Sequence, residues 1–268
     1  MSTGSAAAQG ASIYYEDLGS GPAVVLIHAG VADSRMWDGV FEALAGRFHA
    51  IRFDIRGFGR SAASPGRFSY HHDLEALLDH LAVAQASLVG CSLGGQIAID
   101  FALAYPARVR SLTLVSAGIG GREPSKQMIR FGDEEEALLA RGDIEGATEL
   151  NLRTWVDGPY RSPEEVDGTL RERVRTMQRE LFGQPPQEGM ERIRLEPPAI
   201  GRLGEIKVPT LVIVGDRDLP EMVEAGDRLA SRIPDARKIA FPGAAHLVSM
   251  ERPERFLAVV TEFLLRLP

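Results

Sequence analysis

Residues 90–95 read Gly-Cys-Ser-Leu-Gly-Gly, a G-x-S-x-G pattern that stands between two apolar runs. The run before it, Ala86 to Val89, has the composition of a buried strand, and the run after it, Leu93 to Ala104, has helical spacing. A sharp strand-to-helix turn exposes the hydroxyl of its serine and leaves the flanking backbone N–H groups free to bind an anion. The chain must therefore bend from strand to helix at Ser92, which is the candidate nucleophile.

A serine hydroxyl is a weak nucleophile unless a base takes its proton, so the pattern requires a histidine and an orienting acid elsewhere. The strand-like run Thr210 to Val214 leads into a turn that carries Asp216 and Asp218. A later run, Arg237 to Phe241, leads into His246. The order serine, acid, histidine is the one used on the α/β-hydrolase fold, and it differs from the orders on chymotrypsin-like and subtilisin-like folds.

On these residues the chain resembles the α/β-hydrolase superfamily, in particular its smaller esterases, lactonases and C–C hydrolases. The resemblance covers nearly the whole chain, because family-like segments also occur at residues 28–30 (His-Ala-Gly) and 54–61 (Asp-Ile-Arg-Gly-Phe-Gly-Arg-Ser). It implies that the acid lies three residues after the glycine that ends its strand. This selects Asp218 as the acid, with Asp216 in the same short turn as the alternative.

An acyl transfer also needs hydrogen-bond donors for the negative charge that develops on the carbonyl oxygen. The backbone N–H of Leu93, the residue after the candidate nucleophile, is one such donor by geometry. The resemblance implies that the second donor lies two residues past His28, at Gly30. Many relatives have glycine directly after this histidine, whereas this chain has Ala29, so Ala29 is the alternative donor.

Strand-like and helix-like segments alternate along most of the chain. This alternation predicts an α/β fold with right-handed crossovers and a mostly parallel central sheet that has helices on both faces. The expected strands are Ile13 to Tyr15, Val24 to His28, Ala50 to Phe53, Ala86 to Val89, Ser111 to Ser116, Thr210 to Val214 and Arg237 to Phe241. The expected helices are Asp33 to Leu44, His71 to Leu81, Leu93 to Ala104, Glu221 to Ile233 and Pro253 to Leu265.

Residues 118–203 break the alternation, because they are charged and helix-patterned without a convincing strand. We expect them to form a helical cap, or lid, inserted into a core domain made of residues 1–117 and 204–268. Between Pro163 and Phe182 the apolar residues recur at helical spacing, which predicts one buried helix face. The apolar residues of this face are Val166, Leu170, Val174, Met177 and Leu181, and those expected to face water are Arg171, Glu172, Arg175 and Arg179.

The position of this insertion matches where similar hydrolases place a lid, so the cap is expected to roof the pocket and to select the substrate. The residues expected to line the substrate pocket are Ala29, Met128, Phe131, Trp155 and Phe182.

Composition limits the partners of the chain. Its 268 residues carry a net charge of −7, which argues against nucleic acid, because phosphates require a basic surface. Met1 to Ser12 has neither the basic nor the apolar part of a leader, and no run is long enough to cross a bilayer. The single cysteine, Cys91, excludes an internal disulfide and is expected to be a small packed residue. We expect a cytoplasmic monomer or homodimer without metal or cofactor.

Three functions are compatible with these residues. The favoured one is hydrolysis of small or medium carboxylic esters or lactones through an acyl-serine intermediate. The second uses Ser92, Asp218 and His246 in a different reaction, as in a C–C bond hydrolase or enol-lactonase of aromatic degradation, or in a perhydrolase. The third is a ligand receptor on the same fold that does not turn over its ligand.

Overall fold

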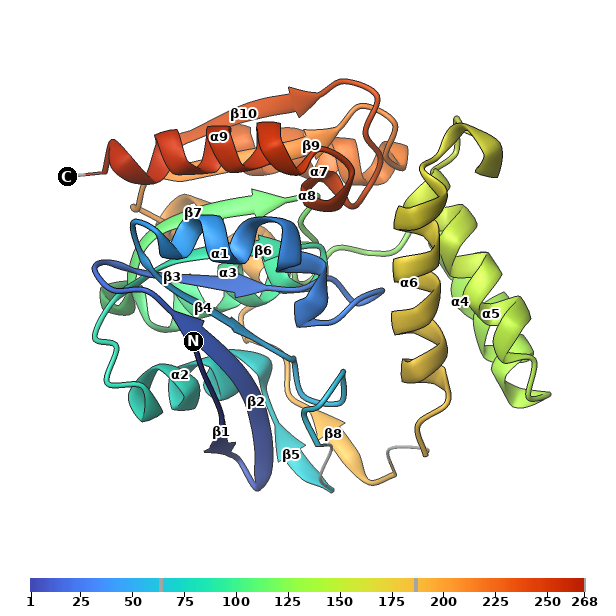
Figure 1. The fold of residues 1–268 in the computed structure, drawn as a ribbon, viewed down its shortest axis with the longest axis horizontal. Helices are drawn as coiled ribbons and strands as arrows, with labels where there is room; N and C mark the ends of the chain where they lie inside the picture. Colours follow the sequence, from blue (N-terminus) through green and yellow to red (C-terminus); the bar gives the residue numbers. More distant parts are fainter. Residues whose placement is uncertain (63–64, 186–187, 268) are drawn as a thin grey trace.

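The computed structural model describes residues 1–268 except 63–64, 186–187 and 268, and its centre is one large sheet (Figure 1). The sheet has eight strands in the order β1-β2-β4-β3-β6-β7-β9-β10. The pairs β1–β2 and β2–β4 are antiparallel, and the other neighbours are parallel. The strands are β1 (Ser2–Ala8), β2 (Ala11–Leu18), β3 (Ala23–Ile27), β4 (His49–Phe53), β6 (Ala86–Cys91), β7 (Val109–Val115), β9 (Thr210–Gly215) and β10 (Ala236–Phe241).

Helices cover both faces of the sheet, because successive strand residues point to opposite sides. In β3, Val25 and Ile27 pack with the helices α2, α3 and α7, whereas Val24 and Leu26 pack with α1, α8 and α9. This arrangement confirms the α/β fold that the alternation predicts. The helices are α1 (Asp38–Ala45), α2 (Tyr70–His80), α3 (Leu93–Ala104), α7 (Pro220–Arg232), α8 (Val248–Glu251) and α9 (Pro253–Leu265).

Several elements of the core differ from the sequence expectation, and β5 (Gly66–Phe68) and α8 were not expected. The first strand, Ser2–Ala8, was not expected, because it consists of small residues with little strand preference. It forms through its antiparallel ladder with β2, and Ala6 and Ala8 face the core. The helix expected from Asp33 begins instead with a 3₁₀ turn over Ser34–Trp37, in which the Asp33 carboxylate accepts a hydrogen bond from the Arg35 N–H, and α1 follows at Asp38.

Between β7 and β9, the described residues form three α-helices that lie beyond the carboxyl ends of the parallel strands (Figure 1). They are α4 (Lys126–Ala140), α5 (Ile144–Asn151), which continues into a π-helical segment (Leu152–Asp157), and α6 (Gly168–Phe182). The expectation that this segment lacks a strand is wrong, because β8 (Met190–Arg192) pairs in parallel with β5 (Gly66–Phe68). A three-residue strand has too short a pattern to be recognised from sequence.

Helix α6 begins later than expected, because Pro163–Glu165 forms a separate 3₁₀ turn. Leu170, Val174 and Met177 form its buried face, as the helical spacing predicts. The expectation that Arg171 faces water is wrong, since only 12% of its side chain is exposed. Its guanidinium pairs with Asp157 and Glu149.

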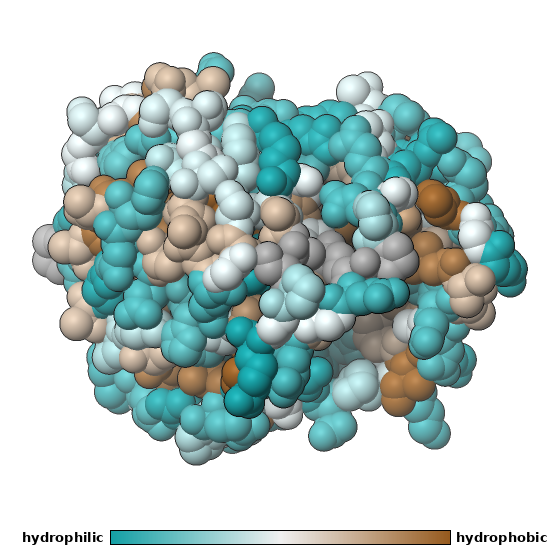
Figure 2. Space-filling model, turned by 90° about the horizontal axis from the view of Figure 1, so that it is seen from below, coloured by the Kyte–Doolittle hydropathy of each residue, from teal (hydrophilic) through white to brown (hydrophobic). Residues whose placement is uncertain are grey.

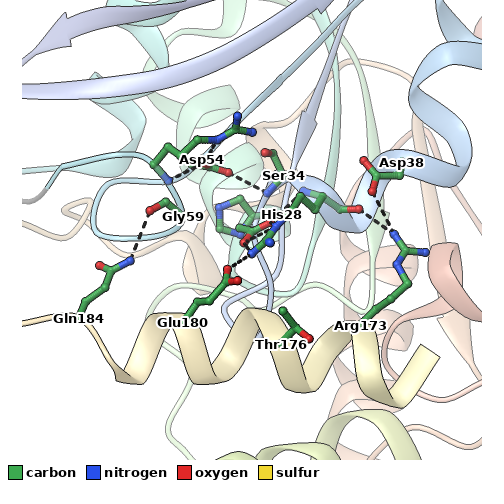
Figure 3. A network of polar contacts seen from close by, with 12 residues as sticks. His28, Ser34, Asp38, Asp54, Gly59, Arg173, Thr176, Glu180 and Gln184 are labelled. Atoms are coloured by element: carbon green, nitrogen blue, oxygen red, sulfur yellow. Dashed lines mark hydrogen bonds and ion pairs between the residues drawn. The ribbon is translucent and has the colours of Figure 1, made fainter. Parts of the chain in front are cut away.

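Polar contacts join α6 to loops of the core on one side of the molecule (Figure 3). Arg173 donates to the backbone oxygen of Arg35 at 3.0 Å and pairs with Asp38 at 3.3 Å. Glu180, two turns further along α6, pairs with the Arg35 guanidinium. Helix α6 therefore rests on the segment that follows β3, and these contacts are largely exposed ion pairs, each worth about 0–1 kcal/mol.

Hydrophilic side chains predominate on the face seen from below, and apolar residues there form separate small patches (Figure 2). Across the described residues, none of the helices has the length and apolar character needed to cross a bilayer.

Asp100, on α3, is a buried acid that the core does not fully satisfy. It is 6% exposed, and its Oδ1 has no hydrogen-bond partner among the described residues. Burial raises its pKa from 3.8 to about 6. Because one unit corresponds to about 1.4 kcal/mol, ionisation of this carboxyl costs the folded state about 3 kcal/mol.

Asp100→Asn is expected to raise the free energy of unfolding by about 2–3 kcal/mol at pH 8 and to change it little at pH 4. The folded-state pKa lies above the unfolded one, so the stability from the protonated acid is complete below about pH 4 and is lost as the pH rises through about 6. Urea unfolding of both proteins at several pH values between 4 and 8 measures this. A difference in the free energy of unfolding between the two proteins that does not vary with pH would contradict this prediction.

Candidate active site

Ser92 lies at the turn between β6 and α3 with the strained backbone that the sequence pattern predicts. Its φ is 54° and its ψ is −112°, a conformation that non-glycine residues rarely adopt. The turn is tight enough to require glycine on both sides. A Cβ at Gly90 would lie 2.3 Å from the Gly94 oxygen, and one at Gly94 would lie 2.2 Å from the Ile27 oxygen.

Asp218 and His246 meet at the same edge of the sheet, each in the loop that follows a parallel strand. Asp218 follows β9, His246 follows β10, and His246 Nδ1 lies 3.0 Å from Asp218 Oδ2 and 3.2 Å from Oδ1. Both side chains are 1% exposed. The Oδ1 atom also accepts a hydrogen bond from the Leu219 N–H at 2.8 Å. The acid is thereby held in one orientation, and its negative charge faces the imidazole.

Asp216 has a different role in the same turn. Its carboxylate accepts a hydrogen bond from the Gly243 N–H at 2.7 Å, and 44% of its side chain is exposed. The carboxylate bonded to His246 is that of Asp218. Asp216 instead ties the turn after β9 to the loop after β10.

Cys91 links the Ser92 turn to the His246 loop. Its Sγ lies 3.9 Å from the backbone oxygen of His246, and its side chain is fully buried, as expected for a small packed residue. Burial, together with the charge of Asp218, raises the pKa of the Cys91 thiol well above its usual range. A thiol in this state is a poor nucleophile, so Ser92 is the reactive candidate of the pair.

Gly30 and Leu93, the residues expected to bind the oxyanion, are neighbours. A Cβ at Gly30 would lie 3.8 Å from the Leu93 Cβ. In the part of the chain that the structure describes, neither of their backbone N–H groups has an acceptor. The alternative donor, Ala29, is fully buried, and its N–H points to Met36 Sδ at 3.2 Å.

His28 fixes the peptide group between Ala29 and Gly30, a role that sequence analysis did not assign to it. Its Nε2 accepts a hydrogen bond from the Ile55 N–H at 2.8 Å, so Nδ1 carries the proton and donates to the Ala29 oxygen at 2.8 Å. Burial lowers the pKa of His28, which keeps the ring neutral. In a trans peptide the C=O and N–H point in opposite directions, so this bond turns the Gly30 N–H away from His28.

The helical segment between β7 and β9 brings aromatic side chains to the His246 imidazole. The ring centroids of Trp155 and His246 are 4.5 Å apart, and Phe131 meets Trp155 edge-on at 5.7 Å. Met128 lies one turn before Phe131 on the same half-buried face of α4. Phe182 is half-buried at the end of α6, and its ring contacts no other ring among the described residues. No three His, Cys, Asp or Glu side chains of the described residues are grouped to hold a metal ion.

Sequence analysis also missed Arg161 and Glu251, which are buried together beside the His246 loop. Glu251 lies five residues after His246, which is a detectable spacing. Arg161 lies in the segment between β7 and β9, far away in the sequence, and no local pattern marks it.

Comparison with known proteins gives one consistent result. Residues 22–253 match the family model described as alpha/beta hydrolase fold. The chain is 31% identical over 92% of its length to a pimeloyl-[acyl-carrier protein] methyl ester esterase of Nitrosomonas europaea, covering 98% of that protein. It is 32% identical over 95% of its length to a 2-hydroxy-6-oxononadienedioate/2-hydroxy-6-oxononatrienedioate hydrolase of Burkholderia vietnamiensis, covering 91% of it.

Among solved structures, the chain is similar to a thermophilic esterase from Thermogutta terrifontis. The TM-score is 0.80 and the identity is 26%, with coverage of 100% of this chain and 99% of that one.

Proposed function

Because the chain belongs to the α/β-hydrolase fold family, we propose that it hydrolyses small or medium carboxylic esters or lactones through an acyl-serine intermediate. The chain is a hydrolase, and relatives named as esterases support the choice of bond. In this proposal Ser92 is the nucleophile, His246 the general base and Asp218 the acid that orients the base.

One observation carries the proposal, namely the buried hydrogen bond between Asp218 and His246 at the sheet edge where Ser92 occupies its strained turn. A buried carboxylate on Nδ1 holds the proton on that nitrogen and leaves Nε2 free to accept a proton. The contact of Cys91 with the His246 backbone supports proximity between the histidine loop and Ser92.

The mechanism begins when His246 Nε2 accepts the Ser92 hydroxyl proton as Oγ attacks the ester carbonyl. The resulting oxyanion binds the N–H groups of Leu93 and Gly30, whose availability supports this role. His246 then gives its proton to the departing alcohol, which leaves an acyl-serine. A water molecule, deprotonated by His246, attacks the acyl carbon, and collapse of the second intermediate returns the proton to Ser92 and releases the acid.

Gly30 is the better candidate than Ala29 for the second oxyanion donor. The Ala29 N–H is already engaged by Met36, whereas the bond from His28 to the Ala29 oxygen leaves the Gly30 N–H directed away from the histidine. A preorganised donor of this kind contributes about 10²–10³-fold to turnover.

We assign substrate selection to the cap of residues 118–203 above a core of residues 1–117 and 204–268. Trp155 contacts His246 and is itself contacted by Phe131, so these rings and Met128 are proposed to form the acyl or leaving-group wall. Phe182 and Ala29 are proposed to lie further from the reacting bond. An apolar wall beside a polar reaction centre is typical of small-molecule sites.

A second candidate function uses the same three residues on a different bond. It is favoured by the 32% identity to a hydrolase named for a hydroxy-oxo-dienedioate, which covers nearly the whole chain. In this case the enzyme would cleave the bond between the acyl carbon and a carbon atom, rather than the bond between the acyl carbon and an ester oxygen.

A series of p-nitrophenyl esters from acetate to decanoate tests the proposal. We expect sustained release of p-nitrophenol with many turnovers per protein molecule and an optimum at short or medium chains, because the cap limits the space above His246. A single stoichiometric release would indicate a receptor, and no release with hydrolysis of a ring-cleavage dienedioate would indicate the second candidate. Either result would contradict the ester assignment.

A further inference from the structure

Arg161 joins the cap to the loop of His246 through a single buried guanidinium. Its Nε donates to the Asp157 oxygen at 2.8 Å, and its Nη2 donates to the Val156 oxygen at 2.7 Å. Its Nη1 donates to the Gly243 oxygen at 3.1 Å and pairs with Glu251 Oε2 at 2.6 Å. Two of these acceptors are carbonyls at the end of the π-helical segment, which have no partner within the helix.

Glu251 carries the connection to the residue before His246. Its Oε1 accepts a hydrogen bond from the Ala245 N–H at 2.7 Å, while its Oε2 receives Arg161. The carboxylate is 3% exposed, so it depends on these two donors for its stabilisation. The backbone of the His246 loop is therefore fixed by an acid whose buried counter-charge, the Arg161 guanidinium, comes from the cap.

The same cap segment also touches the imidazole and the turn of the acid. Trp155, directly before Val156, places its ring against His246 at 4.5 Å. A Cβ at Gly158 would lie 2.5 Å from the Arg217 oxygen, so the backbone packs closely on the residue before Asp218. Residues 155–158 of the cap thus contact both loops of the acid–base pair.

We propose that Arg161 and Glu251 are positioning residues that hold the His246 loop and the Trp155 segment in one arrangement, so that docking of the cap is part of aligning the catalytic base. This proposal rests on the proposed function. Neither side chain touches the reacting atoms in this account. They act through the backbone at Gly243 and Ala245 and through the carbonyls at Val156 and Asp157.

The expected consequence is kinetic. A misplacement of the base by about 1 Å can cost about 10²-fold in rate, because proton transfer requires hydrogen-bond distance between base and nucleophile. Binding of a small ester depends less on this alignment. Loss of the pair should therefore lower kcat far more than it raises KM.

The test compares Arg161→Met, Arg161→Lys and Glu251→Gln with the matched control Arg173→Met. Arg173 also joins the cap to the core, and among the described residues its hydrogen bonds and ion pair go to Arg35 and Asp38 rather than to the His246 loop. Each protein is assayed for kcat and KM with p-nitrophenyl acetate and for the rate constant of inactivation by a fluorophosphonate. Circular dichroism establishes that each variant is folded at the assay temperature.

We expect Arg161→Met to lower kcat and the inactivation rate constant about 100-fold each, with KM within about threefold of the wild type. Arg161→Lys should recover about tenfold, because an ammonium can pair with Glu251 but lacks the planar fork that also binds the two carbonyls. Glu251→Gln should lose about as much as Arg161→Met, since glutamine replaces one of the two accepting oxygens by an NH2 group, which cannot accept from Arg161 or from the Ala245 N–H. Arg173→Met should stay within about twofold.

The proposal is overturned if Arg161→Met is labelled as fast as the wild type, or if Arg173→Met loses activity to the same extent. If Arg161→Met does not fold, the lysine and glutamine variants decide in the same way. A wild-type protein that the fluorophosphonate does not label overturns the proposed function and this proposal together. If the fluorophosphonate labels the wild-type protein and labels the Arg161 and Glu251 variants equally fast, this proposal alone is overturned.

Discussion

Ser92→Ala is expected to lower kcat for p-nitrophenyl acetate by at least about 10⁴-fold while the protein remains folded. In the proposed mechanism the substitution removes the atom that forms the acyl intermediate, so that the remaining activity would come from the oxyanion donors and from binding alone. The strain stored in the Ser92 backbone persists with alanine, so stability should change little. Steady-state kinetics and thermal unfolding measure the two effects.

The matched control is Ser231→Ala, on the exposed side of α7, where the hydroxyl donates to the Arg228 oxygen one turn earlier in the same helix. Its kcat should equal that of the wild type. A folded Ser92→Ala protein that keeps more than about a tenth of wild-type turnover would end the acyl-serine account.

Asp218→Asn is expected to lower kcat by about 10⁴-fold. The amide can donate to His246 Nδ1 and so favours the imidazole tautomer whose proton is on Nε2, which cannot take the serine proton. The amide also carries no charge to stabilise the imidazolium that forms during attack. Steady-state kinetics with p-nitrophenyl acetate at neutral pH measure this loss of kcat.

Asp216→Asn is the control within the same turn. Asp216 accepts from the Gly243 N–H, and an amide oxygen can accept that bond equally well, so we expect a change of less than about fivefold. A larger loss at residue 216 than at residue 218 would show that the acid is misassigned, although the fold would be unaffected.

Much of the fold could be predicted from sequence because its elements carry local signals. The apolar run before Ser92 and the helical spacing after it define a strand and a helix, and both occur as β6 and α3. The acid in the turn after β9 and the histidine after β10 follow from the order of strands, since the carboxyl ends of parallel strands share one edge of the sheet.

The missed features depend on partners that a local pattern does not contain. Strand β1 is made of small residues and forms only because β2 offers a ladder. Arg171 was expected in water because it lies outside the apolar face of its helix, yet it is covered by Asp157 and Glu149 from the neighbouring segment. The bond from Arg161 to Glu251 joins residues separated by 90 positions. Helical spacing predicts which face is apolar, but it does not identify the polar partner.

The central claim is that Ser92 is activated by His246 and Asp218. Reaction of the wild-type protein with a fluorophosphonate, followed by mass spectrometry of its peptides, tests this claim most directly, because only an activated serine reacts rapidly. We expect a single adduct on the peptide that contains Ser92, and strongly reduced labelling in Asp218→Asn. An adduct on a different residue, or a wild-type protein that remains unlabelled, would contradict the claim.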